Sequence, residues 1–268
     1  MKKLVSICTL AVLLLAGCAS KPSEPKADTT IKVGASPTPH AIILEALRPE
    51  IESKGYKLEI VEFNDYVLPN TALEANELDA NYFAHLPYQE DFNVKNGTHI
   101  KSVLAVHFEP FGIYPGKSAS LDDLNGKTFA IPNDTTNEAR ALQLLAKNGY
   151  ITLDPSKGLE ATPKDITENP HNLQFVELEA ATIPRTLADV DFGIINGNYA
   201  LSANLGDSVL LTETSDSEGA AKYANILCVK EGNETSEKTK VLLEAFKSAA
   251  VKQVVAEKFG KLVVLVIE

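Results

Sequence analysis

Arg140 is a candidate for binding a carboxylate group. It lies early in a predicted helix, 136–147, which follows a predicted strand, 127–132, and a turn. Its guanidinium presents a planar pair of N–H donors that can bind both oxygens of a carboxylate, which the ammonium group of lysine cannot do. The residues alone leave a second interpretation open, in which Arg140 is a surface residue that pairs with Glu138 or Asp134.

Aromatic side chains that could line an apolar slot are concentrated in one stretch of the chain. The chain has 8 tyrosines and 10 phenylalanines, and ten of them lie between Tyr56 and Tyr114. Most of these follow predicted strands, and several neighbour asparagine, histidine or proline instead of standing inside apolar runs. The pattern predicts a pocket wall, and the alternative is that these residues form the core of one lobe.

The residue patterns of metal sites and of common enzymes are missing from the sequence. The 5 histidines have no spacing that places two of them on one helix face, and there is no histidine-rich loop. No Gly-x-Ser-x-Gly, His-Glu-x-x-His or glycine-rich phosphate loop occurs. Acidic pairs such as Glu177 and Glu179 are interpreted as solvated carboxylates. We therefore expect a protein that is not an enzyme and that uses no metal and no cofactor.

Length and charge limit the class of protein further. The chain has 268 residues, enough for a full core, and 36 acidic against 25 basic residues, so its net charge is −11. This acidic balance argues against a nucleic-acid partner. The 3 cysteines do not make a disulfide scaffold, and Cys228, in an apolar run, is expected to be a small buried side chain.

The N-terminus carries an export signal. Two lysines precede an apolar stretch, 4–16, which is too short to cross the roughly 30 Å apolar layer of a bilayer as a helix. The stretch ends in Leu15-Ala16-Gly17-Cys18, which resembles the bacterial lipobox, where the cysteine is lipidated and becomes the new N-terminus. We expect a signal peptide at 1–17, lipidation of Cys18 and a flexible tether over 18–30. The protein would be exported to the outer face of the bacterial cytoplasmic membrane or to the periplasm.

Behind the tether, predicted strands and helices alternate. Strands are expected at 31–35, 57–63, 79–83, 127–132, 173–178, 192–195 and 224–229, and helices at 40–54, 69–78, 136–147, from 182 and, as one long terminal helix, at 236–259. The alternation predicts an α/β fold of mostly parallel sheets that bind ligands at the carboxyl ends of their strands. The last apolar run, 262–267, is expected to be a packed terminal strand.

Several sequence segments occur in the order and spacing of a known family. They are 63–70, 79–88, 131–140, 168–170, 176–180, 184–185, 195–196, 199–200 and 223–225. With the lipobox, this ordered set resembles the methionine-binding lipoproteins of bacterial ABC importers (NlpA/MetQ-type substrate-binding proteins), over nearly the whole chain. Ala84 and Asn198 depart from the family pattern, since Gln-like and Thr-like residues are typical there.

The resemblance implies a two-lobed periplasmic-binding-protein fold (type II), with the ligand in the cleft between α/β lobes. Lobe one would comprise 31–112 plus 201–268 and lobe two 113–200, and the chain would cross between them near 111–115 and near 199–204. Such a protein captures L- or D-methionine and delivers it to the permease and ATPase subunits of an ABC transporter, while its lipid anchors it to the membrane. Three alternatives stay open: another small hydrophobic amino acid, a methionine-containing dipeptide, or a surface adhesin.

The resemblance also implies the ligand-binding residues. Arg140 would hold the carboxylate of the ligand, and Asn137 belongs to the same segment. Asn196 and Asn225 would contact the amino-acid backbone of the ligand. The slot for its side chain would be lined by aromatic and histidine residues, namely Tyr66, Phe83, His85 and Tyr88.

Overall fold

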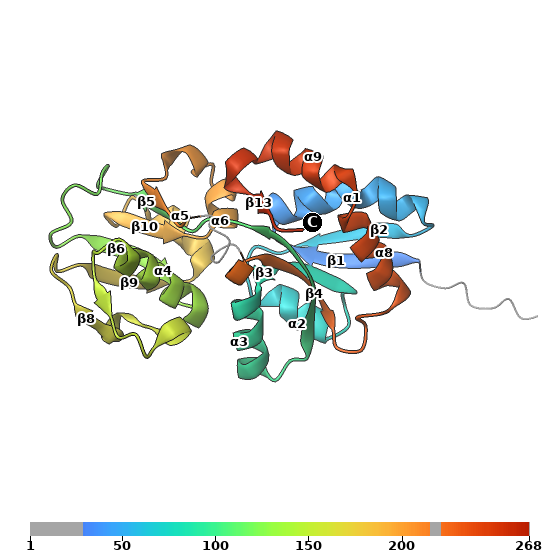
Figure 1. Ribbon diagram of the computed structural model, residues 1–268, viewed down its shortest axis with the longest axis horizontal. Coiled ribbons are helices and arrows are strands. Elements are labelled where there is room, and N and C mark those ends of the chain that lie inside the picture. The colour runs from blue at the N-terminus through green and yellow to red at the C-terminus, as the bar shows by residue number, and fades with distance from the viewer. Residues whose placement is uncertain (1–28, 215–220, 268) are drawn as a thin grey trace, which may run out of the picture.

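The computed structural model describes residues 29–214 and 221–267 of the chain. These residues form two lobes that lie side by side, each built around its own β-sheet (Figure 1). The prediction of a two-lobed α/β architecture is therefore confirmed. The predicted signal peptide, the lipidation site Cys18 and the tether as far as residue 28 lie outside the described residues.

The first lobe contains a six-stranded sheet in the order β13-β4-β12-β3-β1-β2. Its strands are β1 (Thr30–Ala35), β2 (Lys57–Glu62), β3 (Ala80–His85), β4 (Ile100–Phe108), β12 (Asn225–Lys230) and β13 (Val264–Leu265). Its helices are η1 (Pro37–Ala41), α1 (Ile42–Ser53), α2 (Leu68–Glu74), α3 (Leu86–Asn96), α8 (Glu237–Phe246), α9 (Ala249–Lys258) and η6 (Gly260–Leu262).

Alternating side chains of β12 show how the helices cover this sheet. Leu227 and Val229 belong to the core that α1, α8 and α9 share with one face. Ile226 and Cys228 belong to a second core, which includes Leu73 of α2, on the other face. This period of two is the geometry of a strand that is buried on both sides. Cys228 is fully buried, as predicted.

The second lobe contains a five-stranded sheet in the order β11-β5-β10-β6-β9. Its strands are β5 (Gly112–Pro115), β6 (Thr128–Pro132), β9 (Gln174–Leu178), β10 (Phe192–Ile195) and β11 (Leu211–Thr212), and β7 (Thr152–Leu153) pairs with β8 (Ile166–Glu168) beside it. The helix α4 (Thr135–Lys147) packs on one face, and α5 (Ile183–Thr186) and α6 (Gly197–Ser202) contribute to the core on the other. Short 3₁₀ turns are η2 (Gly158–Glu160), η3 (Pro163–Asp165), η4 (Ala180–Thr182) and η5 (Gly206–Ser208).

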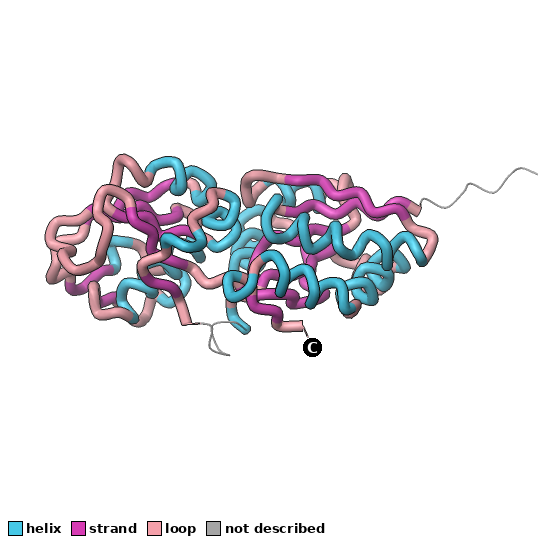
Figure 2. The backbone as a smooth tube through the Cα atoms, turned by 90° about the horizontal axis from the view of Figure 1, so that it is seen from above, coloured by secondary structure: helices cyan, strands magenta, loops and turns pink. Residues whose placement is uncertain are grey.

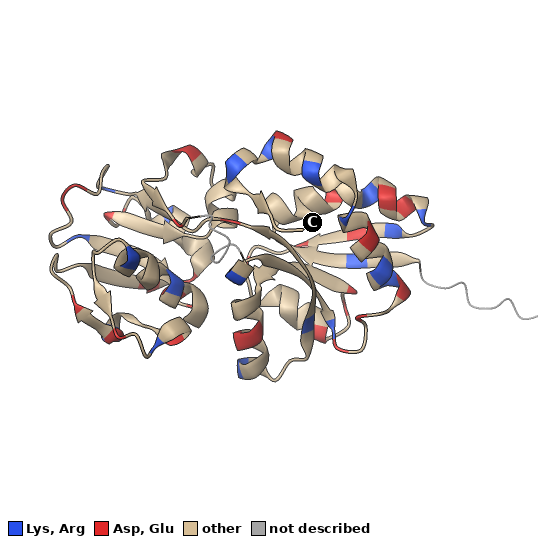
Figure 3. Cartoon of the chain, in the orientation of Figure 1, with Lys and Arg blue, Asp and Glu red and all other residues tan. Residues whose placement is uncertain are grey.

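Seen from above, both lobes have strands flanked by helices and loops (Figure 2). Most charged side chains lie on the outer faces of the two lobes. Lysine, arginine, aspartate and glutamate are spread over the outward faces of α1, α8 and α9 and over the loops of the second lobe (Figure 3). Among the described residues, no helix is both long enough and apolar enough to cross a membrane.

The prediction of mostly parallel sheets is wrong. The pairs β1–β2, β1–β3, β6–β9 and β6–β10 are parallel, as alternating strands and helices predict. In the first sheet β12 and β13 run opposite to the other strands, and in the second sheet β5 does. All pairs that involve β4, β5, β11, β12 or β13 are therefore antiparallel. A chain that passes from one sheet to the other and back enters each sheet without a crossover helix, so its direction is not constrained to be parallel.

The predicted terminal helix is divided into α8 and α9. The backbone of Ser248 is extended (φ −69°, ψ 157°), so the helical hydrogen bonds stop at Lys247 and start again after Ser248. Serine favours such a boundary because it is a weak helix former and is common at the N-cap, the position just before the first turn of a helix. Two residues of the last apolar run form a strand, β13, as expected, and this strand pairs with β4.

The chain passes between the sheets through two segments. The first, 109–111, joins β4 to β5, close to the predicted position. The second joins β11 to β12, and its described residues are 213–214 and 221–224. The prediction of this crossing near 199–204 is wrong, because those residues belong to α6 and its following turn, and β11 still pairs with β5 in the second sheet. Part of the region assigned to lobe one from residue 201 therefore lies in the second sheet.

Gly116→Ala tests the packing of the second lobe. A methyl group at Gly116 would lie 2.4 Å from the carbonyl oxygens of both Leu187 and Val190, and backbone atoms cannot move aside cheaply. We expect the free energy of unfolding to fall by about 1–3 kcal/mol, the usual cost of overpacking. The measurement is urea unfolding. Lys117→Ala, at the neighbouring exposed position, is the control and should change it by less than about 0.5 kcal/mol.

Candidate ligand-binding site

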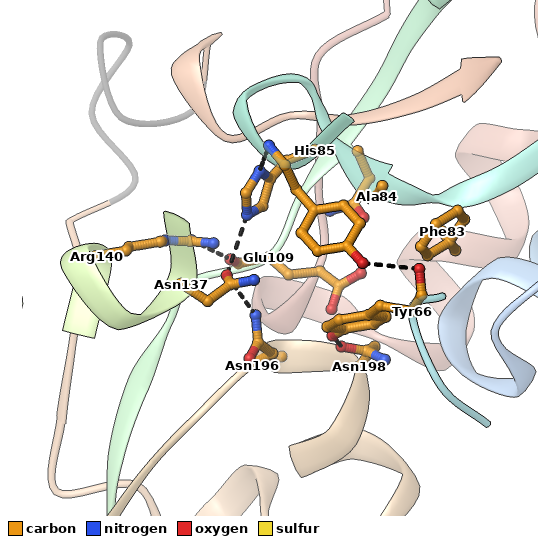
Figure 4. Close-up of a pocket in the computed structure, with 12 residues that line it drawn as sticks. Tyr66, Phe83, Ala84, His85, Glu109, Asn137, Arg140, Asn196 and Asn198 are labelled. Atoms are coloured by element: carbon orange, nitrogen blue, oxygen red, sulfur yellow. Dashed lines mark hydrogen bonds between the residues drawn. The ribbon is translucent and has the colours of Figure 1, made fainter. Parts of the chain in front are cut away.

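A pocket between the lobes brings the predicted site residues together (Figure 4). It encloses about 340 Å³ that no protein atom fills, part of it open to solvent. Its lining includes all of the predicted ligand-binding residues: Tyr66, Phe83, His85, Tyr88, Asn137, Arg140, Asn196 and Asn225. Four further residues line it that the sequence did not predict: Ala84, Glu109, Gly197 and Asn198. The ligand-binding role of these residues stays a prediction.

The elements that carry these residues meet at the boundary of the two sheets. From the first lobe come the carboxyl end of β3, the start of α3 and the first residue of β12. From the second lobe come the first turns of α4 and the link between β10 and α6. The first lobe thus supplies the aromatic residues and His85, and the second lobe supplies Arg140 and most of the amides.

Arg140 is buried, with 4 % of its surface exposed, and its partner is Glu213. Its Nε donates to Glu213 Oε1 at 2.8 Å and its Nη2 to Glu213 Oε2 at 2.5 Å, while Nη2 also donates to the carbonyl of Glu109 at 3.1 Å. The interpretation that Arg140 pairs with Glu138 or Asp134 is wrong; Asp134 instead caps α4 by accepting from Asn137 N–H. The two-pronged donor of Arg140 is bound by a carboxylate of the chain itself.

Glu109 is the carboxylate of the pocket, and the sequence analysis missed it. It begins the first crossing, directly after β4, and it is 5 % exposed. Burial raises its pKa to about 7, against the opposing effects of His40, Arg140 and the backbone N–H of Asn198. Gly197 allows this approach, since a Cβ there would lie 2.6 Å from the Cβ of Glu109. The only signal in the sequence is an acidic residue at a strand end among aromatic residues.

A buried histidine network holds Glu109 and Asn225. His107 Nε2 lies 2.7 Å from Glu109 Oε1, and its Nδ1 bonds to the hydroxyl of Tyr82. His40 Nε2 lies 2.9 Å from Asn225 Oδ1 and 3.5 Å from Glu109. Burial lowers the pKa of His40 to about 4 and that of His107 to about 3, so both rings are neutral near pH 7.

His40, His107 and Glu109 are also a group whose atom types suit a metal ion. Their ligand atoms lie within 4.8 Å of one another, and spacing along the chain did not predict this because His40 belongs to η1 and His107 to β4. Three of the four ring nitrogens are hydrogen-bonded within the network, which leaves His40 Nδ1 without a partner among the described residues. As it stands, the group orients Glu109 and Asn225 by hydrogen bonds.

A second network joins the lobes through Asn137. His85 Nδ1 accepts from the N–H of Tyr88 at the start of α3, so the other nitrogen, Nε2, carries the proton and donates to Asn137 Oδ1 at 3.1 Å. Asn196 Nδ2 donates to the same oxygen at 2.9 Å. Asn196 Oδ1 is buried without a hydrogen-bond partner among the described residues and is free to accept from a ligand.

Tyr66 stands at the centre of the apolar wall of the pocket. Its ring lies 5.9 Å from that of Phe83 and 5.7 Å from that of Tyr88, measured between centroids. Its hydroxyl donates to Asn198 Oδ1 at 2.6 Å, from the first lobe to the second. The aromatic residues between Tyr56 and Tyr114 divide between the two interpretations of the sequence. Tyr66, Phe83 and Tyr88 line the pocket. Tyr82, Phe108 and Phe111 are fully buried core residues.

Comparisons with known proteins agree on one family. The family model described as NlpA lipoprotein matches residues 31–267. The methionine-binding lipoprotein MetQ of Bacillus subtilis is 38 % identical over all of both chains. A lipoprotein structure from Ruminococcus gnavus has a TM-score of 0.87 and 49 % identity and covers 90 % of this chain and 100 % of its own. A nutrient-binding protein from Burkholderia cenocepacia, solved bound to methionine, has a TM-score of 0.83 and 38 % identity and covers 88 % of this chain and 100 % of its own.

The neutral buried histidines predict loss of stability in acid. Burial lowers the pKa of His85 to about 3, with Arg140 adding to the effect, and the pKa values of His40 and His107 are similarly low. The unfolded chain, with ordinary pKa values near 6.5, binds more protons below that pH, so stability falls as pH decreases from about 6.5 toward 4. Each histidine lowers the free energy of unfolding by up to about 2 kcal/mol between pH 6.5 and 5. The reason is that a group protonated only in the unfolded chain changes this free energy by about 1.4 kcal/mol per pH unit.

Thermal unfolding at pH 7.5 and 5 measures this effect. Glu109 acts in the opposite direction, because its raised pKa favours the folded state at low pH, but it is one group against three. His85→Gln, which keeps a hydrogen-bond donor and cannot titrate, should reduce the difference between the two melting temperatures. Equal stability of the natural protein at both pH values would contradict the assignment of neutral histidines.

Proposed function

The chain belongs to the NlpA lipoprotein family, and from this premise we propose that it captures methionine outside the cytoplasm and delivers it to a membrane permease that an ATPase drives. In this role it is a binding protein and not an enzyme. Relatives from Bacillus subtilis and Salmonella typhimurium are named methionine-binding and D-methionine-binding lipoproteins, and a structural neighbour was solved bound to methionine. The lipobox at Leu15-Ala16-Gly17-Cys18 supports a lipid anchor on Cys18 that keeps the two lobes at the membrane surface.

The pairing of opposite charges in the pocket is the observation that carries the proposal. A free amino acid has a carboxylate and an ammonium group, and the pocket offers a guanidinium and a carboxylate for them. Arg140 and neighbouring amides would bind the carboxylate of the ligand, and Glu109 with Asn196 Oδ1 would accept from its ammonium group. Because His85 is neutral, it adds a hydrogen bond to the site without adding charge.

The apolar wall suits an unbranched thioether side chain. Tyr66, Phe83 and Tyr88 present aromatic surface to the pocket, and Ala84 leaves space beside them. Burying a side chain of this size in apolar surroundings contributes roughly 1.5–3 kcal/mol. Contact between sulfur and an aromatic ring adds about 0.3–1.5 kcal/mol.

Closure of the lobes around the ligand would complete the site. Three hydrogen bonds already link the lobes next to the pocket: Tyr66 to Asn198 at 2.6 Å, His85 to Asn137 at 3.1 Å and the hydroxyl of Tyr199 to the carbonyl of Asn64 at 3.3 Å. A ligand that contacts both lobes favours the closed arrangement by its differential affinity for it.

Calorimetric titration of the soluble protein from Ala19 onward tests the proposal. The protein is first unfolded and refolded to remove bound ligand, and it is then titrated with L-methionine, D-methionine, leucine and glycyl-methionine. We expect one methionine enantiomer to bind with a Kd of about 1 μM or tighter, which is about −8 kcal/mol or better. A folded protein that binds leucine or the dipeptide more tightly than either methionine would contradict the choice of ligand.

Arg140→Ala and Asn225→Ala should weaken methionine binding. Each substitution removes a buried polar contact to the ligand. A hydrogen bond to a charged group contributes about 1.5–3 kcal/mol, so its loss should raise the Kd about 10- to 100-fold. Arg48→Ala and Asn148→Ala make the same changes outside the pocket and serve as controls. Circular dichroism confirms folding. Wild-type affinity in both pocket variants would remove this assignment of the site.

Methionine binding should tighten as the pH rises from 5.5 to 8. The free protein has a Glu109 pKa of about 7, and only the ionised carboxylate attracts the ammonium group of the ligand. Below pH 7 the proton must be removed before binding, which weakens the affinity by up to about tenfold per pH unit. The neighbouring His40 and His107 have much lower pKa values and stay neutral over this range. Glu109→Gln should bind weakly and without this pH dependence, as calorimetry at several pH values would show.

A further inference from the structure

We propose that Glu213, which lies on the described part of the segment by which the chain returns to the first sheet, is a positioning residue for Arg140 in the ligand-binding site. The inference rests on the proposed function, because it concerns how the carboxylate of an amino-acid ligand is held. Glu213 directly follows β11 and does not line the pocket. Its effect on the ligand would therefore act through Arg140.

The hydrogen bonds of Arg140 leave one nitrogen for a ligand. A guanidinium has five N–H donors, one on Nε and two on each terminal nitrogen. Glu213 accepts from Nε and from Nη2, and the carbonyl of Glu109 accepts the second bond from Nη2. Nη1 has no partner among the described residues, and Arg140 lines the pocket. A ligand carboxylate would therefore meet Nη1, and the two-pronged edge of the guanidinium stays with Glu213.

Glu213 is itself held in place by the first crossing segment. Its backbone N–H donates to the carbonyl of Phe111 at 2.9 Å, and the N–H of Phe111 donates to Glu213 Oε2 at 3.1 Å. The two segments that cross between the sheets are thus hydrogen-bonded to each other at this residue. A carboxylate with a fixed backbone and one further donor, the N–H of Phe111, has little freedom, so it defines the position of the guanidinium that it binds.

Aromatic rings from both crossing segments hold the planar faces of the guanidinium. The Cζ of Arg140 lies 4.2 Å from the ring centroid of Tyr223 and 4.9 Å from that of Phe111. Tyr223 belongs to the returning segment and also packs against His85, with 5.3 Å between ring centroids. Edge contacts from Glu213 and face contacts from the rings together determine where Nη1 points.

The pairing also sets the charge that the ligand meets. Glu213 neutralises most of the charge of Arg140, so the affinity for the ligand carboxylate depends on a well-placed N–H and less on net positive charge. Loss of the Glu213 charge should consequently weaken binding of a carboxylate ligand, because Arg140 becomes free to leave the position. A side chain that only stabilised the fold would weaken the binding of every ligand alike.

Calorimetry with two ligands separates these cases. Wild type, Glu213→Gln and Glu213→Asp are titrated with L-methionine and with L-methioninamide, which has an uncharged amide in place of the carboxylate. We expect Glu213→Gln to weaken methionine binding at least tenfold and methioninamide binding less than threefold, so that the preference of the protein for the acid falls. Glu213→Asp keeps the charge on a shorter side chain and should weaken methionine binding to a smaller extent. Glu244→Gln, which removes a carboxylate from an exposed ion pair with Lys54, is the control and should leave both Kd values unchanged.

A second measurement needs no ligand. The ¹⁵N–¹H signal of Arg140 Nε should be protected from exchange with water in wild type and should lose this protection in Glu213→Gln. Unchanged methionine affinity in Glu213→Gln, equal weakening of both ligands, or an Nε signal that does not respond would each overturn the inference. Failure of wild type to bind methionine would instead overturn the proposed function, and the Nε signal would still report whether Glu213 holds Arg140.

Discussion

Burial of charge between the lobes is the constraint on which the site depends. Arg140 and Glu109 are at most 5 % exposed, and an unpaired charge in such a position costs several kcal/mol. The structure meets this constraint with partners from distant parts of the chain. Arg140 binds Glu213 and lies between the rings of Tyr223 and Phe111, while Glu109 binds His107. A ligand therefore meets groups that are already held in position, which lowers the entropy cost of binding.

Neutral histidines make this arrangement possible without additional buried charge. His40, His85 and His107 have pKa values far below 7 because they are buried. Each ring bonds to a polar residue of the pocket: His40 to Asn225, His85 to Asn137 and His107 to Glu109. These bonds fix the directions of the amide and carboxyl groups that face the cleft. Positively charged rings here would compete with the ammonium group of an amino acid for Glu109.

The two crossing segments place the site at the point where both sheets end. Glu109 and Phe111 lie on the first, and Glu213 and Tyr223 lie on the second. The carboxyl end of β3 and the first turns of α3 and α4 meet them there. A change in the relative position of the lobes must alter this set of contacts, because they come from both sides and from the segments between them. In the proposed function, ligand binding and lobe closure would therefore be parts of one equilibrium.

The sequence by itself determined the local features of this protein. The lipobox, the strands and helices with clear apolar periodicity and the buried Cys228 are carried by short segments, whose patterns depend on neighbouring residues. The eight predicted residues that line the pocket followed from the resemblance of such segments to a known family. The tertiary structure decided which distant groups meet. Glu109 lies at a strand end with no distinctive pattern, Glu213 is separated from Arg140 by most of the second lobe, and His40 and His107 come from different elements. The antiparallel strands and the place of the second crossing were also set there. These features depend on pairing across long sequence separations, and local propensity carries no information about which of many possible partners a buried charge will find.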